Sequence, residues 1–175
     1  MKFRQMIKVP RERVCVIIGK NGEIKKRIEE KTNTKINIID ESIEIEGENS
    51  IDVWIVRDVI KAIARGFSPQ RAFSLFNEEN AIEIIELTDY IGKSKNTLIR
   101  LKGRIIGKEG KARKLIEELS ETYISVYGKS VAIMGKIENI EIARRAVEML
   151  LQGAKHATVY RMLEKERRKR KEMVL

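Results

Sequence analysis

One short glycine-rich segment occurs twice in this 175-residue chain, each time at the same point of a longer repeat. The first copy reads Ile-Ile-Gly-Lys-Asn-Gly over 17–22, and the second reads Ile-Ile-Gly-Lys-Glu-Gly over 105–110, 88 residues later. The same offset aligns further identical residues without a gap: Lys26 with Lys114, Thr34 with Thr122, Ser42 with Ser130 and Gly47 with Gly135. This self-similarity predicts two copies of one small domain.

Both copies show the same order of predicted elements. In the first copy these are an extended segment 2–9, an apolar run 14–18 into the glycine loop, a helix with Ile24 and Ile28 on one face, alternating strands 35–39 and 42–46, and a helix 51–64. In the second they are 82–87, 96–106, 111–121, 123–127, 131–134 and 140–151. The predicted class is therefore α+β, with β-α-α-β-β-α twice and helices on one face of each three-stranded sheet.

Four segments divide the chain on this basis. The first domain covers 1–66, a helical connector covers 67–80, the second domain covers 81–153, and a basic C-terminal helix covers 154–175. Pro69 is suited to open a short helix in the connector, and Phe73 and Phe76 give it an apolar surface. We therefore expect a packed connector and a fixed angle between the domains.

The Gly-Lys-x-Gly loop between the first two helices resembles that of the KH domain in its type I topology. Many KH domains carry an isoleucine three residues after the second glycine, where this chain has Lys25 and Arg113. The apolar positions of the following helix are instead Ile24 and Ile28 in one copy and Ala112 and Ile116 in the other. The resemblance implies a fold that clamps about four nucleotides of single-stranded RNA.

The loop residues suit contact with a phosphate backbone. Glycine has no Cβ and tolerates positive φ, and the start of the following helix favours an anion. The alternative interpretation is a tight turn between two helices, which the duplication and the central lysine disfavour. The residues predicted to bind RNA are Gly19, Lys20, Asn21, Gly22, Lys25, Lys26, Ile36, Arg104, Gly107, Lys108, Glu109, Gly110, Lys111, Arg113, Lys114 and Ile124.

The charge of the chain supports a polyanionic partner. The net charge is +10, and half of this excess lies in the last 22 residues. Residues 157–171 can form one helix, with Val159, Met162 and Leu163 as a docking stripe. Its basic residues, which would strengthen RNA binding without reading sequence, are Arg167, Arg168, Lys169, Arg170 and Lys171. A solvated helix end without a partner is the alternative.

Enzymatic chemistry finds no support in the sequence. The single histidine, His156, and the single cysteine, Cys15, cannot supply a clustered zinc site, and we expect no metal and no cofactor. No nucleophile–base pair stands out among the carboxylates, which alternate with Lys and Arg. The chain has neither a signal-peptide core nor an apolar stretch of about 18 residues, so a cytoplasmic binding protein is expected. Abundant Lys, Glu and Ile are typical of a heat-adapted prokaryote.

Taken together, the loops, connector and tail are similar to the archaeal relatives of the Partner-of-Nob (Dim-two) family. The most specific matches are 65–69, 104–114 and the tail 156–171. The resemblance implies binding near the 3′ end of small-subunit ribosomal RNA or its precursor in the pre-ribosomal small subunit, where the protein assists 3′-end processing. It also implies contact with the Nob endonuclease and the alpha subunit of translation initiation factor two.

Two other functions fit the same sequence. One is an accessory factor of RNA degradation or transcription, and the other is a mainly protein-binding scaffold. Asn21 and Glu109 make the two loops unequal in charge. We expect the second loop to be the principal RNA clamp, and the first to extend the footprint or meet a partner.

Overall fold

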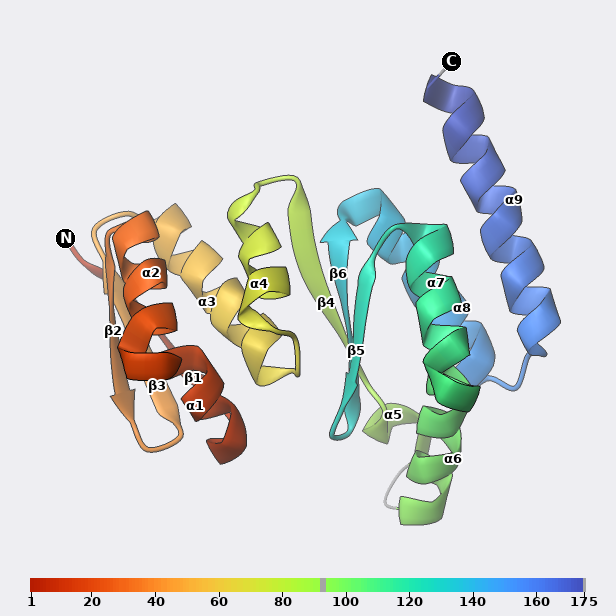
Figure 1. Cartoon of the computed structure of the whole chain (residues 1–175), viewed down its shortest axis with the longest axis horizontal. Coiled ribbons are helices and arrows are strands. Elements are labelled where there is room, and N and C mark those ends of the chain that lie inside the picture. The colour runs from red at the N-terminus through yellow and green to blue at the C-terminus, as the bar shows by residue number, and fades with distance from the viewer. Residues whose placement is uncertain (92–93, 175) are drawn as a thin grey trace. The chain divides into compact units, whose positions relative to one another are not determined.

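The computed structural model of the chain describes residues 1–91 and 94–174, which form two compact units that divide between Glu78 and Glu79 (Figure 1). Gly92, Lys93 and Leu175, which the sequence assigns to the second domain and the tail, lie outside the described residues. Each unit contains a three-stranded antiparallel sheet, as predicted.

The first unit follows the predicted β-α-α-β-β-α order. Its sheet has the strand order β1-β3-β2, so the strand that comes last in sequence is central. The elements are β1 (Phe3–Lys8), α1 (Arg11–Ile18), the 3-10 turn η1 (Lys20–Gly22), α2 (Glu23–Thr32), β2 (Thr34–Ile39), β3 (Ser42–Gly47), α3 (Ser50–Ala64), α4 (Pro69–Ala72) and η2 (Phe73–Phe76).

The second unit repeats this order with one short additional helix and a long C-terminal one. Its sheet has the equivalent strand order, β4-β6-β5. The elements are β4 (Asn80–Glu86), α5 (Thr88–Ile91), α6 (Lys95–Ile106), the turn η3 (Lys108–Gly110), α7 (Lys111–Ser120), β5 (Tyr123–Tyr127), β6 (Ser130–Lys136), α8 (Ile137–Leu151) and α9 (His156–Val174).

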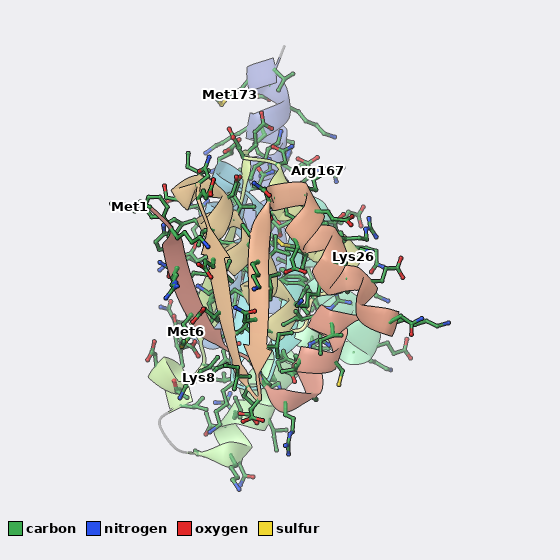
Figure 2. The ribbon with its side chains drawn as sticks, turned by 90° about the vertical axis from the view of Figure 1, so that its left-hand side faces the viewer. Met1, Met6, Lys8, Lys26, Arg167 and Met173 are labelled. Carbon is green, nitrogen blue, oxygen red and sulfur yellow. The ribbon has the colours of Figure 1, made fainter. Side chains whose placement is uncertain are left out.

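Alternating strands leave one face of the first sheet to solvent and bury the other under helices. Ile43 and Ile45 of the central strand are fully buried against the helix side. The opposite face carries Met6 and Lys8 of β1, and Figure 2 shows this face toward the viewer. The period-two pattern of 42–46 therefore predicted the two faces of the central strand correctly.

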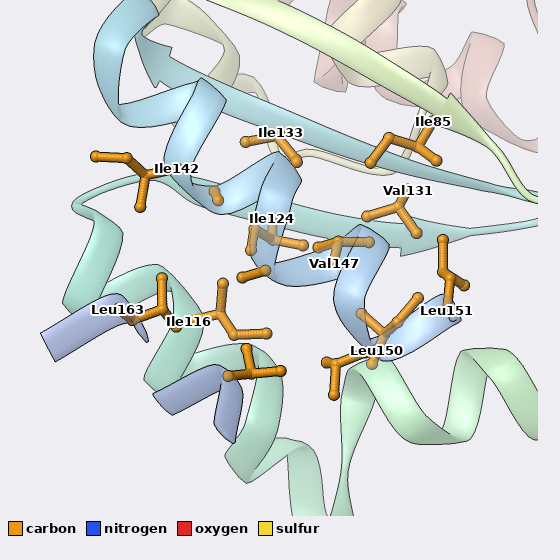
Figure 3. Close-up of a cluster of buried hydrophobic side chains, with 14 of the residues drawn as sticks. Ile85, Ile116, Ile124, Val131, Ile133, Ile142, Val147, Leu150, Leu151 and Leu163 are labelled. Atoms are coloured by element: carbon orange, nitrogen blue, oxygen red, sulfur yellow. The ribbon is translucent and has the colours of Figure 1, made fainter. Parts of the chain in front are cut away.

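The core of the second unit joins the sheet to three helices and to α9. Ile85, Val131 and Ile133 from the strands pack with Ile116 of α7 and Val147 of α8 (Figure 3). Leu163 of α9 belongs to the same cluster. Val159 and Leu163 are both 0 % exposed, which confirms them as the docking stripe of the tail. The first turns of α9 are thus part of the folded core of this unit.

The repeat continues past the closing helices α3 and α8. Gly66 and Gly153 both take positive φ, 104° and 96°, and the next amide donates to a carbonyl five residues upstream at 3.1 and 2.9 Å. The residue six positions after each glycine is apolar and 0 % exposed: it is Ala72 in the first unit and Val159 in the second. The segment α4–η2, which packs on α3, is therefore the short equivalent of α9.

Candidate nucleic-acid interface

The two glycine loops have almost identical backbones. Gly19 and Gly107 both have φ 74°, with ψ 179° and 175°, and Gly22 and Gly110 have φ 74° and 76° in the left-handed region. In each loop the amide of the second glycine donates to the carbonyl of the first, at 3.3 and 3.2 Å. The sequence repeat is thus also a repeat of conformation, and each loop delivers the chain to the start of a ten-residue helix.

The two glycines of a loop meet different surroundings. A Cβ added to Gly19 would lie 2.4 Å from Ile24 Cγ1, and one added to Gly107 would lie 2.6 Å from Ala112 Cβ. The first glycine of each loop is therefore needed for close packing on the following helix. A Cβ at Gly22 would meet no atom within 4 Å, and one at Gly110 would meet only side-chain ends, Lys114 Cε at 3.8 Å and Arg113 Nη2 at 4.0 Å. The second glycine thus presents an open surface that a ligand can approach.

Charged residues at the loops differ between the units. Lys20 and Lys108 are both exposed beside the open glycine. The first residue of the following helix is Glu23 in one unit and Lys111 in the other, which reverses the charge at the helix N-terminus. An acidic residue at this position competes with a bound anion, whereas a lysine attracts one.

Two predicted RNA ligands on the helices after the loops are engaged within the protein. Lys25 Nζ lies 3.3 Å from Glu29 Oε1, and Arg113 Nη1 lies 2.5 Å from Glu117 Oε1. The other carboxylate oxygen of each glutamate accepts the backbone amide of Ile36 or Ile124, at 2.9 and 2.8 Å. Lys25 and Arg113 thus help to clip a strand to a helix, whereas Lys26, Lys111 and Lys114 stay exposed.

Ile36 and Ile124, both predicted to bind RNA, are buried. Their exposed fractions are 1 % and 2 %, and they pair in the sheet with Ile45 and Ile133, which face the helices. The prediction that these side chains touch RNA is wrong for this conformation, because the core already covers them. Ile38 and Val126, two residues further along the same strands, are only partly buried and are the accessible apolar positions.

Arg104, which the sequence predicted as an RNA ligand, has a structural role as well. Its guanidinium donates to the carbonyl of Leu150, at 3.1 Å, and to that of Ala154. In the first unit Arg13 makes the same pair of bonds, to Ile63 and Phe67 O, both at 2.8 Å. In each unit an arginine of the helix before the loop therefore binds the carbonyl groups at the end of the closing helix, where a cation is favourable.

A pocket of about 450 Å³ lies beside the second loop. It is formed by α6, the loop, the start of α7 and the start of α9, so it lies within one unit. Arginine and lysine side chains, a glycine surface and two aromatic rings line it: Arg100, Gly103, Arg104, Gly107, Lys108, Lys111, Ala112, His156 and Tyr160. A basic pocket with rings is suited to a nucleotide.

The two rings of this pocket are fixed in place. His156 Nε2 lies 2.8 Å from the carbonyl oxygen of Arg104, to which it donates, and its ring centroid is 6.1 Å from that of Tyr160. Burial raises the pKa of the Tyr160 phenol. From the sequence, neither His156 nor Tyr160 was predicted to bind RNA. Their spacing of four residues at the start of a helix was the signal that both rings lie on one helix face.

The basic residues of the tail divide into two groups. Arg170 Nη2 donates to the carbonyl of Leu119, at the end of α7, at 2.6 Å. Arg170 therefore stabilises the docked helix. It is not the freely exposed cation that the sequence predicted. Arg168, Lys169 and Lys171 are exposed, and Arg167 is half-buried. Lys169 Nζ lies 3.8 Å from Glu166 Oε1.

The described residues hold no cluster of three or more His, Cys, Asp or Glu side chains that could bind a metal ion. Over residues 1–91 and 94–174, no helix is long and apolar enough to cross a bilayer. The candidate site thus consists of two loops that each carry a lysine, and the second of these loops adjoins a basic pocket.

Comparison with known proteins identifies the fold family. The family described as eukaryotic type KH-domain (KH-domain type I), that of the second KH domain of PNO1, matches twice, over residues 11–81 and 81–168. A KH domain-containing protein of Methanocaldococcus jannaschii, MJ0443, is 46 % identical over 173 residues, which is 96 % of this chain and 76 % of that protein. The pre-rRNA-processing protein PNO1 of Coccidioides immitis is 32 % identical over 135 residues, 74 % of this chain and 53 % of its own length. The chain thus spans about half the length of the PNO1 relative.

A solved structure shows the same fold. It is the crystal structure of an a/eIF2alpha–aDim2p–rRNA complex from Pyrococcus horikoshii OT3, of which one chain is 46 % identical to this chain with a TM-score of 0.90. The match covers 96 % of each chain.

Proposed function

The chain belongs to the PNO1/Dim2 family of type I KH-domain proteins, and on this premise we propose that it binds single-stranded RNA during maturation of the small ribosomal subunit. The observation that carries the proposal is the repeated loop, whose second glycine is open to a ligand beside an exposed lysine. The open glycine leaves room for a phosphate to approach the backbone amides at the start of the helix.

The proposed RNA is the 3′ region of small-subunit ribosomal RNA or of its precursor. The pre-rRNA-processing description of the PNO1 relative and the rRNA in the Pyrococcus complex support this choice. By assisting 3′-end processing the protein would act beside the Nob endonuclease, as the family resemblance implies. The presence of a/eIF2alpha in the same complex supports the alpha subunit of initiation factor two as a second partner.

We further propose that the second loop is the principal clamp. Lys111 begins its helix where Glu23 begins the helix of the first loop, and the basic pocket adjoins the second loop. The first loop then extends the RNA footprint or contacts a protein partner.

The test is a matched pair of substitutions at the open glycines. Gly110→Asp places a carboxylate at the phosphate position, whereas Gly110→Asn has nearly the same shape, tolerates the same backbone and adds no charge. In equilibrium binding to a single-stranded oligonucleotide from the 3′ end of small-subunit rRNA, we expect the Asp variant to bind at least about tenfold more weakly than the Asn variant. The same pair at Gly22 should differ less.

Two outcomes would count against the proposal. Equal affinity of all four variants and the unmodified protein would show that the loops do not bind the RNA. A scrambled oligonucleotide that binds as tightly as the ribosomal one, with other transcripts recovered by crosslinking in cells, would favour a role in RNA degradation or transcription.

A further inference from the structure

The pocket beside the second loop combines two kinds of side chain. Arg100, Lys108 and Lys111 supply cations, and His156 and Tyr160 on α9 supply aromatic rings. Its volume of about 450 Å³ falls within the range of ~300–1,000 Å³ that is usual for small-ligand sites. Cations beside flat rings match a nucleotide, which pairs a phosphate with a planar base.

Gly103 gives this pocket a flat surface on α6. It stands inside a helix, where glycine costs roughly 0.5–1 kcal/mol relative to alanine. A Cβ at this position would meet no atom within 4 Å, so packing within the protein does not require the glycine. The missing side chain instead leaves helix backbone open to a planar group.

The two rings are held rigidly by the fold. Val159 and Leu163, which flank Tyr160 on α9, are fully buried in the core of the unit. His156 is tied by its hydrogen bond to the carbonyl of Arg104. Tyrosine is uncharged at neutral pH, and burial raises the pKa of Tyr160 further, so its phenol does not repel a phosphate. The arrangement of the rings is therefore formed before any ligand arrives, which lowers the entropic cost of binding.

The first unit uses the equivalent aromatic residue differently. Phe73 precedes Tyr160 by 87 residues, the offset that relates the segments after Gly66 and Gly153. The guanidinium of Arg27 lies over the Phe73 ring, 5.1 Å from its centroid. That ring face is already covered, whereas Tyr160 lines a pocket.

We propose that this pocket holds one nucleotide of the bound RNA, with its base against Tyr160 and Gly103 and its phosphate among Lys108, Lys111 and Arg100. The inference rests on the proposed RNA-binding function and adds to it a subsite that α9 completes. An acidic peptide would satisfy the cations alone but would leave the ring and the flat glycine surface without a partner.

The experiment uses the full chain with Tyr160→Leu and Tyr160→Phe. Leucine keeps apolar bulk on α9 but removes the planar ring, whereas phenylalanine keeps the ring. We expect the Leu variant to bind the ribosomal 3′ oligonucleotide about 5- to 100-fold more weakly and the Phe variant to stay within about threefold of the unmodified protein. Thr158→Ala, at an exposed position of α9, is the control and should leave affinity unchanged. Equal melting temperatures would show that α9 remains docked.

A second measurement locates the base directly. Photocrosslinking of the same oligonucleotide with 4-thiouridine at successive positions should give an adduct at one position on the peptide that contains His156 and Tyr160. Normal affinity of Tyr160→Leu with weakened Gly110→Asp would overturn the subsite and leave RNA binding by the loop intact. No binding by the unmodified protein would overturn both. Competition for the pocket by poly-glutamate but not by mononucleotides would overturn the subsite in favour of an acidic protein.

Discussion

Asn21 and Glu109 occupy the same left-handed position in the two loops, with φ 56° and 58°. Asparagine adopts this conformation readily, whereas glutamate has no local hydrogen bond that offsets its cost of about 1–2 kcal/mol. Glu109 also places an exposed carboxylate beside the open glycine of the second loop. Glu109 therefore adds conformational strain to the loop and lowers its attraction for phosphate.

Glu109→Asn should accordingly improve two properties at once. We expect the free energy of unfolding of the second unit to rise by up to about 1 kcal/mol, because the strained position accepts asparagine. RNA affinity should rise as well, because a carboxylate leaves the phosphate site. Urea denaturation and equilibrium RNA binding measure the two effects separately. The reverse change, Asn21→Glu, should lower stability; a gain in stability there would contradict the argument.

Single residues were the hardest feature to predict from the sequence. The loop glycines were predictable because positive φ and close packing restrict the residue type. The roles of Ile36 and Arg104 were not, because both depend on which distant segment packs against them. Strand alternation groups the residues that share a face, but it does not separate the part of that face under helices from the part that stays accessible.

At the scale of helices and strands, both units share a second repeated interaction, in which a glutamate joins the helix after the loop to the next strand. Glu29 and Glu117 each accept a basic side chain at one carboxylate oxygen and a strand amide at the other. The offset of 88 residues holds for every partner. The departure from the usual KH isoleucine at Lys25 and Arg113 thus has a structural reason, since these cations orient the glutamate that clips the strand.

Glu117→Ala should cost about 1.5–3 kcal/mol in the free energy of unfolding of the second unit. The substitution removes a charged hydrogen-bond acceptor and leaves the part-buried amide of Ile124 without its partner. Urea denaturation measures the loss, and hydrogen exchange should show faster exchange at the Ile124 amide. Glu118→Ala, an exposed neighbour on the same helix, is the control. Equal stability of the two variants would exclude the clip.

At the scale of the whole molecule, the excess positive charge and the folded core meet in α9. The start of this helix is buried through Val159 and Leu163, and Arg170 binds the end of α7. Deleting the tail would therefore damage the second unit, and truncation cannot isolate the contribution of charge. Exposed cations near the end of the helix, such as Arg168 and Lys171, can be neutralised without touching these interactions.

Neutralising Arg168 and Lys171 together to glutamine should weaken RNA binding and flatten its salt dependence. For single-stranded RNA, each cation that no longer neutralises a phosphate lowers the slope of log K against log salt by about 0.7, so the pair should remove at most about 1.4. The matched control is Lys8→Gln with Lys35→Gln, two exposed cations on the outer face of the first sheet, which should leave the slope unchanged. Figure 2 labels Lys8 on this face. Equal slopes for both double variants would show that the tail end does not bind RNA. A slope near zero for the unmodified protein would instead favour a scaffold that binds mainly protein.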